Sequence, residues 1–559
     1  MNQPTPAIVA QSAVRRLPRW ALLLFCAAYV LPGFIGRGPW KNADMMAFGY
    51  MNELAQGRAH WLAPTLLGQP PEFDALLPYW LGAWAMQLAP GWIAPDFAAR
   101  VPFILLLVLT LVATWYGVYY LARTPNAQPV PFAFGGEAHP TDYARAVADA
   151  GLLALVACLG LMQLSHETTP SLAQLGFTAL SFYGLAALPY RLAFPAVAIG
   201  LGLLGLALSG APSMAVLFAL GGAVLHSADT PADAATPARG RFGALLVLGL
   251  AAVAAAVASG FQAWHWRLDL DDSGHDWRSL AKLVVWFTWP VWPLALWTAW
   301  RWRRQLNHRH VALPLWFAAV CAITTLLAPN PDRALLLSLP ALAALAAFAL
   351  PTFSRSASAL IDWFTLLFFS GIAFFIWVMW IAIQTGFPAK PASNVAKLAP
   401  GFVPEFALLP FLVALLATIA WVWLVRWRTK RSREAIWKSL VLPAGGTALA
   451  WLLATTLWLP ALDYARNYTA VVDGLTKRLD VTGCVEVFGL TRPQIAALRF
   501  HGGLELRQAT LPSACPWLVV AQEFQPSLTM ALDARQWTLV ATIRRPTDKN
   551  DNLLLYKKR

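Results

Sequence analysis

The sequence predicts a polytopic all-α membrane protein of about thirteen transmembrane helices, with periplasmic amphipathic helices in its first loop and a small C-terminal α/β periplasmic domain. Of its 559 residues, 58% are hydrophobic and only 13% are charged, whereas a soluble domain carries about 25% charged residues. Apolar runs of roughly 18 to 25 residues recur along the chain, each long enough to cross a hydrocarbon core of about 30 Å. Charged residues become frequent again only after about residue 463.

Thirteen apolar runs are the predicted membrane spans. They lie at about residues 20–36, 100–122, 147–164, 171–189, 193–209, 213–227, 242–262, 281–300, 312–328, 334–350, 361–383, 402–425 and 437–459. Because 193–227 fits either one hairpin or a broken pair, twelve and fourteen spans stay as alternatives. The first run follows Arg15, Arg16 and Arg19 and lacks a small-residue cleavage site, so we expect it to remain as an anchor.

Basic residues determine the predicted orientation. The net charge of +14 is spread over short loops, which favours a positive-inside topology over nucleic-acid binding. Arginine and lysine concentrate in 301–304 and 426–433, on the same side as the N-terminus. We therefore expect a bacterial inner-membrane protein with a cytoplasmic N-terminus. The loops 37–100, 263–280 and 384–401 and the C-terminal tail would then be periplasmic.

The predicted division is a transmembrane domain, 1–462, followed by a soluble periplasmic domain, 463–559. Short alternating runs in the tail predict strands at 484–490, 504–509, 517–522, 537–545 and 553–558, with a helix at 492–500. Cys484 and Cys515 predict a disulfide in an oxidising periplasm, with two free thiols as the alternative. The tail could serve to select an acceptor or to brace the outer loops.

The loop 37–100 holds the candidate chemistry. It is rich in Trp, Tyr and Leu, and it carries most of the acidic residues of the first quarter of the chain. These are Asp44, Glu53, Glu72, Asp74 and Asp96. An apolar loop that carries carboxylates between two membrane spans is typical of a catalytic layer on the bilayer surface.

Three segments carry a family resemblance. Asp44 opens NADMMAFGYMNELAQGRAHWLAPTLLGQPPEFDALLPYWLGA, the run AARVPF leads into the second span, and 327–347 reads LAPNPDRALLLSLPALAALAA. These segments resemble the GT-C glycosyltransferases, and more narrowly the bacterial relatives of the protein O-mannosyltransferases and of the aminoarabinose transferase that modifies lipid A. The first loop of that group opens with Asp, usually Asp-Glu, and continues through Gly-x-Trp-x-x-Pro to Leu-x-Tyr-Trp. The resemblance covers about the first 350 residues.

The resemblance implies a hexosyl- or pentosyltransferase that uses a polyprenyl-phosphate-linked sugar as donor. It would transfer the sugar with inversion to a lipid, polysaccharide or protein acceptor at the periplasmic face. Asp44 would be the base that activates the acceptor. The alternative is that Asp44 only caps a helix over 45–56. Tyr79 and Trp80 fall in the Leu-x-Tyr-Trp segment and would bind substrate.

The chain departs from the family where relatives have Glu-Lys-Pro-Pro and it has Phe73, Asp74, Ala75 and Leu76. Glu72 and Asp74 are therefore either a displaced acidic member or ordinary loop residues. Another cation must meet the carrier phosphate, and Arg makes bidentate contacts. The basic candidates on the outer face are Arg58, Arg100, Arg267, Arg278, Lys282 and Arg333, of which Arg333 is preferred.

Two further outer segments are candidates. In LSHETTPSLAQ, Glu167 could replace the second-loop Asp of relatives, and His166 could shuttle a proton or meet a metal ion. A solvated pair without chemistry is the alternative. The segment WHWRLDLDDSGHDWRSLAK, with His265, Arg267 and Asp271, suits sugar or acceptor binding, or else interfacial packing.

Two rival functions remain. A polytopic transporter or flippase usually carries ionisable residues at mid-membrane depth and internal repeats, which this sequence does not show. A catalytically inactive relative that binds the lipid carrier is the other rival, because the family Lys is missing. We expect a monomer that binds the lipid-linked donor and membrane lipid, with no certain cofactor and a divalent cation left open. The sequence specifies neither the sugar nor the acceptor.

Overall fold

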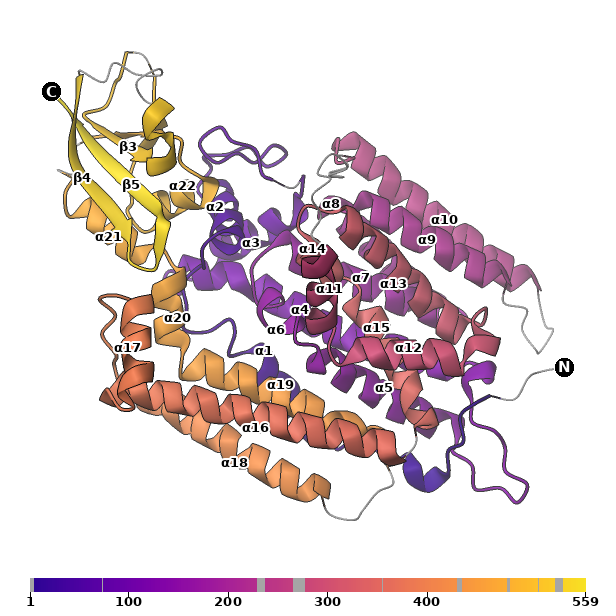
Figure 1. The fold of residues 1–559 in the computed structure, drawn as a ribbon. Coiled ribbons are helices and arrows are strands. Elements are labelled where there is room, and N and C mark those ends of the chain that lie inside the picture. Colours follow the sequence, from indigo (N-terminus) through magenta and orange to yellow (C-terminus); the bar gives the residue numbers. More distant parts are fainter. Residues whose placement is uncertain are drawn as a thin grey trace. The chain divides into compact units, whose positions relative to one another are not determined.

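The computed structural model is mostly helical and describes residues 5–72, 74–228, 237–264, 277–353, 355–429, 435–479, 483–510, 512–527 and 536–559. Figure 1 draws and labels the helices and strands along the chain. The chain divides into two compact units. Unit 1 consists of Met1–Phe34, Phe103–Phe374 and Leu412–Leu453, and unit 2 consists of Ile35–Pro102, Phe375–Phe411 and Ala454–Arg559.

Unit 1 is built from apolar helices. Its complete helices are α1 (Arg19–Val30), α5 (Pro140–Ala157), α6 (Leu161–Leu164), α7 (Pro170–Ala187), α8 (Ala193–Leu208), α9 (Pro212–Ala228), α10 (Pro237–Gly260), α11 (Trp277–Phe287), α12 (Val291–Arg301), α13 (Arg309–Leu327), α14 (Pro331–Leu336) and α15 (Leu339–Ala349). Four helices contain a boundary between the units, so that part of each helix belongs to each unit: α4 (Pro95–Ala122), α16 (Arg355–Thr385), α18 (Leu408–Thr429) and α19 (Lys438–Thr456). Every predicted span overlaps one of these helices or a neighbouring pair.

Several predicted boundaries were wrong. The first span ends at Val30 rather than 36, because Pro32 and Gly33 follow it. The span 147–164 ends at Ala157, and only the short α6 follows. The span 281–300 is two helices, α11 and α12, bent by 86°, with Pro290 in the break. The span 334–350 is likewise divided between α14 and α15, where Pro340 lies at the start of the second helix.

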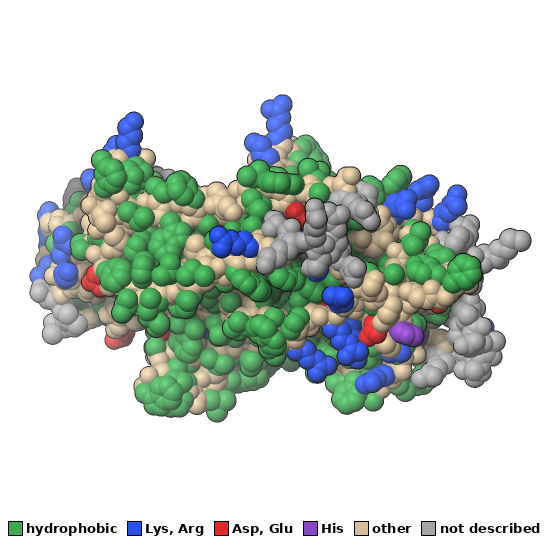
Figure 2. Space-filling model, turned by 90° about the horizontal axis from the view of Figure 1, so that it is seen from below, with side chains coloured by type: hydrophobic (Ala, Val, Ile, Leu, Met, Phe, Trp, Pro, Cys, Tyr) green, Lys and Arg blue, Asp and Glu red, His purple; other side chains and the backbone are tan. Residues whose placement is uncertain are grey.

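The protein is a multi-pass membrane protein. Within the described residues, six helices are long and apolar enough to cross a membrane, or seven when the bent pair α11–α12 counts as one. Two of them, α16 and α18, bury only 22% and 11% of their most apolar windows against the rest of the chain. Apolar side chains cover much of the face in Figure 2, as expected for a surface whose solvent is lipid. The count of thirteen crossings stays a prediction.

Small residues bring helices of unit 1 close together. At the α7–α8 contact, a Cβ added to Gly202 would lie 2.3 Å from Ser181 Oγ and 3.0 Å from the Phe177 carbonyl oxygen. A Cβ on Gly184 would lie 2.9 Å from the Pro195 carbonyl oxygen. The two backbones therefore approach more closely than side chains would permit, which is how small residues stabilise helix pairs in membranes.

Unit 2 contains the first loop and the tail. Its own helices are α2 (Ala43–Ala55), α3 (Leu77–Leu88), α17 (Ala389–Leu398), α20 (Leu459–Arg466), α21 (Thr469–Thr476) and α22 (Arg492–Phe500). Helix α22 packs on α2, where Phe48 and Phe500 meet edge to face at 4.6 Å and Glu53 pairs with Arg499. The tail thus braces the first loop directly.

The tail contains the predicted sheet, and all five predicted strands are present, although the last begins at Asp548 rather than 553. The strands are β1 (Val485–Phe488), β2 (Leu506–Gln508), β3 (Trp517–Ala521), β4 (Trp537–Arg545) and β5 (Asp548–Lys558). Their order is β2-β1-β3-β5-β4. Strand β1 pairs in parallel with β2 and β3, and β5 is antiparallel to both of its neighbours, β3 and β4. A predicted helix over 492–500 is α22, which begins with a capping box between Thr491 and Gln494.

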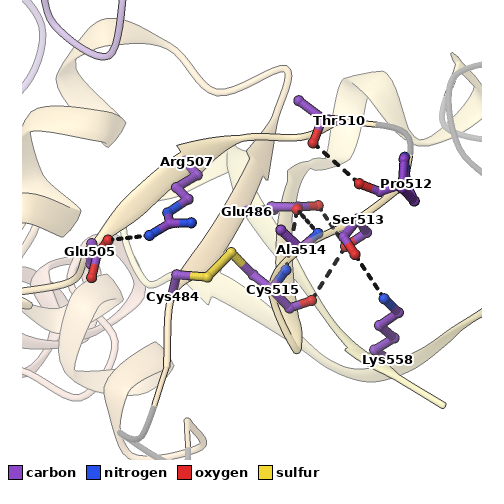
Figure 3. Close-up of a disulfide and its surroundings, with 10 residues drawn as sticks. All are labelled: Cys484, Glu486, Glu505, Arg507, Thr510, Pro512, Ser513, Ala514, Cys515 and Lys558. Atoms are coloured by element: carbon purple, nitrogen blue, oxygen red, sulfur yellow. Dashed lines mark hydrogen bonds and ion pairs between the residues drawn. A yellow bond between two sulfur atoms is a disulfide. The ribbon is translucent and has the colours of Figure 1, made fainter.

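The disulfide between Cys484 and Cys515 is formed, so the alternative of two free thiols was wrong. Figure 3 shows the turn that it holds. The buried Glu486 carboxylate accepts hydrogen bonds from Ser513 Oγ at 2.9 Å and from the Ala514 N–H at 2.8 Å. Lys558 Nζ donates to the Ser513 carbonyl at 2.8 Å. These bonds and the disulfide together attach the 513–515 turn to β1 and to the end of β5.

Candidate active site

Asp44 lies in the first turn of α2, a helix that is buried along its whole length from Asp44 to Leu54. The N-cap is Asn42, in the left-handed region at φ 67°, which Asn tolerates better than most residues. The helix begins at Ala43, two residues earlier than the sequence predicts. Asp44 is therefore inside the helix and is not its N-cap. A carboxylate in the first turn also interacts favourably with the helix dipole.

The Asp44 cluster consists of Arg37, Trp40, Asp44 and Arg100. Arg37 Nη1 donates to Asp44 Oδ2 at 2.6 Å, and the exposed fractions of the two side chains are 2% and 1%. The backbone N–H of Trp40 donates to the same oxygen at 3.0 Å. The Arg37 guanidinium lies 4.6 Å from the centre of the Trp40 ring. All of these contacts lie within unit 2.

Arg100 adds a second buried guanidinium to the cluster. It interacts electrostatically with both Arg37 and Asp44, and its Nη2 donates to Asp96 Oδ2 at 2.9 Å. Of the arginines predicted from the first loop, Arg100 is thus the one that the structure associates with Asp44. Two buried guanidinium groups, those of Arg37 and Arg100, thus interact with one buried carboxylate.

Three other predicted residues of the first loop, Arg58, Tyr79 and Trp80, make described contacts with residues outside the Asp44 cluster. Arg58 donates to Glu53 at 2.8 Å, so it supports α2. Tyr79 is buried and its ring meets that of Tyr50 at 5.3 Å. Trp80 Nε1 donates to the Trp61 carbonyl at 2.7 Å. These three predicted binding residues therefore make contacts that stabilise the loop.

Glu72 and Asp74 are half-buried. Burial raises the pKa of Tyr50 to about 12, the nearby Arg492 opposes that rise, and Glu72 adds to it. Tyr50 is therefore a neutral phenol, and its hydroxyl donates to the Pro70 carbonyl at 2.9 Å. Glu72 belongs to the loop that follows α2 and adds to the rise in the pKa of Tyr50.

The Glu167 cluster lies in unit 1 and consists of Gln163, Glu167, Thr169 and Arg333. Arg333 Nη2 donates to Glu167 Oε2 at 2.8 Å, and its Nη1 donates to Thr169 Oγ1 at 3.3 Å. Gln163 donates to Glu167 Oε1 at 3.2 Å. Glu167 and Arg333, two predicted site residues that are far apart in the sequence, thus form an ion pair. The Glu167 side chain is 10% exposed and that of Arg333 is 17% exposed.

His166 does not share the surroundings of Glu167, although the two are adjacent in the sequence. Its side chain is buried, its Nδ1 faces the Met162 carbonyl, and its Nε2 lies 3.1 Å from the Tyr29 carbonyl. The ring also meets Trp451 at 4.6 Å. A Cβ on Gly33 would lie 2.2 Å from the imidazole. These contacts favour a structural role for His166 over a proton shuttle.

The remaining predicted residues, His265, Arg267 and Asp271, lie outside the residues that the structure describes. In the part of the chain that is described, no group of three His, Cys, Asp or Glu side chains could hold a metal ion.

Sequence reasoning missed Arg37, Trp40 and Asp463. Asp463 Oδ1 accepts from Trp40 Nε1 at 3.0 Å, a contact between residues 423 positions apart. Arg37 offered one signal: it follows the first apolar run and precedes Asp44 by seven residues. No sequence pattern indicated Asp463 as a site residue, because it lies where the predicted tail begins and far from any motif.

Comparison with known proteins identifies the architecture. A crystal structure of ArnT from Cupriavidus metallidurans bound to undecaprenyl phosphate matches 97% of this chain and 98% of its own, with a TM-score of 0.60 and 14% sequence identity. The chain has the GT-C fold of ArnT. The apo structure of the same ArnT matches 96% of this chain and 98% of its own, with a TM-score of 0.61 and 15% identity.

The predicted resemblance to the aminoarabinose transferase is therefore confirmed at the level of the GT-C fold. It extends over nearly the whole chain, whereas the sequence motifs covered only about its first 350 residues. No protein-family model and no curated protein sequence matches the chain. Since the identity to ArnT is 14–15%, the shared GT-C fold assigns no role to any single residue.

Proposed function

We propose that this protein transfers a sugar from a polyprenyl-phosphate carrier, with inversion, to a lipid, polysaccharide or protein acceptor at the periplasmic face of the inner membrane. The single observation that carries the proposal is the GT-C fold shared with ArnT along 97% of the chain. One of the matching ArnT structures binds undecaprenyl phosphate, which is the class of carrier that the proposal requires.

In this proposal Asp44 is the general base. Its carboxylate takes the proton of the acceptor group while the acceptor atom bonds to the anomeric carbon. The bond between that carbon and the phosphate oxygen breaks, and polyprenyl phosphate leaves. The ion pair with Arg37 supports this role, because it holds the buried carboxylate in one orientation.

The leaving phosphate needs a cation, and Arg333 is the proposed one. The described hydrogen bonds of its guanidinium run from Nη1 and Nη2 to Thr169 and Glu167, and an Arg head has five N–H donors in all. Glu167 would hold the guanidinium in one orientation, which is a more limited role than that of the second catalytic acid predicted from the sequence. The side chain is 17% exposed, so it is accessible to a ligand.

The proposal includes the expected placement of the chain. Residues 1–462 would form the transmembrane glycosyltransferase domain and 463–559 the periplasmic domain. The predicted binding roles of Glu72, Asp74, Tyr79, Trp80 and the 264–282 segment are kept as part of this proposal. The predicted binding role of Arg58 is kept as well, beside its ion pair with Glu53.

The test is sugar transfer by membranes that contain the parent protein or the variant Asp44→Asn. A polyprenyl-phosphate sugar is the donor, and the products are followed by mass spectrometry. We expect transfer by the parent and a loss of at least about a hundredfold in the variant. Glu505→Gln, on an exposed side chain of the tail, is the control and should retain parental transfer. A transporter would still move its substrate in the Asp44 variant, and an inactive carrier-binding relative would show no transfer even in the parent.

A further inference from the structure

The segment that precedes α2 is attached to α20, the helix that follows the last apolar span. Asp463 Oδ1 accepts hydrogen bonds from the Gly38 N–H and from Trp40 Nε1, both at 3.0 Å. Asp463 Oδ2 accepts from Asn467 Nδ2 at 2.9 Å. One carboxylate therefore bonds both to the backbone and to a side chain of a segment more than 420 residues away.

Arg466, one helical turn later on α20, contacts the same segment. Its carbonyl accepts from the Lys41 N–H at 2.6 Å, and its guanidinium lies 5.0 Å from the centre of the Trp40 ring. Residues 463 and 466 are three apart and so lie on one face of the helix. Helix α20 thus makes contacts along 38–41 that a local turn could not provide.

Trp40 connects these contacts to Asp44. Its indole N–H is used by Asp463, its backbone N–H donates to Asp44 Oδ2, and its ring lies beneath the Arg37 guanidinium. Arg37 in turn donates to the same Asp44 oxygen. A shift of Trp40 would therefore disturb both the bond from its backbone N–H and the bond from Arg37 Nη1 to Asp44 Oδ2.

We propose that Asp463 is a positioning residue that fixes Trp40 and thereby the orientation of the Asp44 carboxylate. This inference rests on the proposed function for its catalytic consequence. A general base must be aimed at the acceptor proton, and a misplacement of about 1 Å can cost a hundredfold in rate. Asp463 acts through Trp40 and does not need to contact donor or acceptor.

The test compares Asp463→Ala with Asp463→Asn in the full-length protein. The Ala variant removes all three hydrogen bonds that the Asp463 carboxylate accepts. Asn keeps an oxygen where Oδ1 accepts from Gly38 and Trp40 and loses only the bond from Asn467. Two readouts are measured: amide hydrogen exchange of a peptide that covers 36–42, and kcat and KM for a polyprenyl-phosphate sugar. For Asp463→Ala we expect about tenfold faster exchange, with kcat about tenfold lower and KM for the carrier unchanged. Asp463→Asn should restore both values.

Trp40→Phe is the second variant, in case Asp463→Ala does not fold. It removes the indole N–H and keeps the backbone N–H that bonds to Asp44, so it should lower kcat by a smaller factor. Asp473→Ala, at an exposed position of α21, is the matched control and should behave as the parent does.

Parental exchange and parental kcat in Asp463→Ala would overturn the proposal. Faster exchange with parental kcat would also overturn it, because Asp463 would then hold the segment without orienting the base. If the parent itself transfers no sugar, the proposed function fails. The positioning proposal then fails in its catalytic part, while the exchange experiment still decides whether Asp463 holds the segment.

Discussion

Arg37 Nη1 lies 2.6 Å from Asp44 Oδ2, and neither side chain has more than 2% of its surface exposed. They are seven positions apart in the sequence, across the turn that leads into α2. Burying two opposite charges is costly unless they are paired and hydrogen-bonded, and here the Trp40 N–H adds a further bond. The pair therefore makes the entrance to α2 sensitive to single substitutions.

Arg37→Met should destabilise the protein strongly. Removal of one partner leaves the Asp44 charge buried with less compensation, which costs about 3–5 kcal/mol in comparable buried pairs. Thermal unfolding in detergent measures the effect. Arg507→Gln is the control, because its partner Glu505 is 69% exposed and Arg507 itself is 55% exposed, and exposed pairs contribute about 0–1 kcal/mol. Equal shifts in the two variants would contradict the prediction.

Arg333→Lys should weaken the donor's binding. Lysine keeps the charge but loses the planar fork that contacts two acceptors at once, so we expect KM for the polyprenyl-phosphate sugar to rise about tenfold. Steady-state kinetics with graded donor concentrations measures this rise. Arg301→Lys, where the guanidinium lies over the Trp300 ring, is the control. An unchanged KM in Arg333→Lys would exclude Arg333 from phosphate binding.

Gly49→Ala should loosen the contact between α2 and α22. The added Cβ would lie 2.5 Å from the Ala496 Cβ, so one helix must move, and such overpacking costs about 1–3 kcal/mol. The Gly91→Ala variant serves for comparison, since a Cβ there has no neighbour within 4 Å. Differential scanning calorimetry in detergent would reveal a lower Tm for Gly49→Ala alone. A similar Tm in the two variants would show that α22 can yield at this contact.

His501 should make the stability of unit 2 depend on pH. Burial lowers its pKa from 6.5, and the carboxylates of Asp96, Asp463 and Asp473 oppose that shift without reversing it. The folded state therefore binds a proton less readily than the unfolded state. Stability is complete above the ordinary pKa and declines as the pH falls through the lowered one.

His501→Gln should flatten this dependence, as seen in unfolding midpoints between pH 7.5 and pH 5. His60→Gln, at an exposed position of the first loop, should retain the parental slope. A slope in His501→Gln equal to that of the parent would assign the pH dependence to another group.

Local patterns in the sequence predicted much of the fold. The apolar runs predicted where the helices lie, because an uncharged apolar run long enough to cross a bilayer is typical of a membrane helix. The alternating runs of the tail located all five strands, since side chains on a strand alternate between its two faces. Breaks within a run were predicted less well. The sequence predicts one span over 281–300, whereas the structure has two helices, α11 and α12, which are bent by 86° at a break that contains Pro290.

The candidate site was predicted less completely. An acidic residue at the start of the first loop was a local signal, and Asp44 is indeed buried in the first turn of α2. Arg58 and Tyr79 matched the expected residue types, yet their contacts are with Glu53 and Tyr50. Residue type alone did not predict these neighbours, because a partner within the loop depends on how the loop folds.

The sequence by itself determined that this chain is a multi-spanning membrane protein with a folded tail and an acidic first loop, because those features depend on composition and short-range periodicity. Only the tertiary structure decided that Arg37 pairs with Asp44, Arg333 with Glu167, and Asp463 with Trp40. The last two pairs join residues 166 and 423 positions apart. Such contacts follow from how distant elements pack, and a periodic pattern along one element carries no information about its partner.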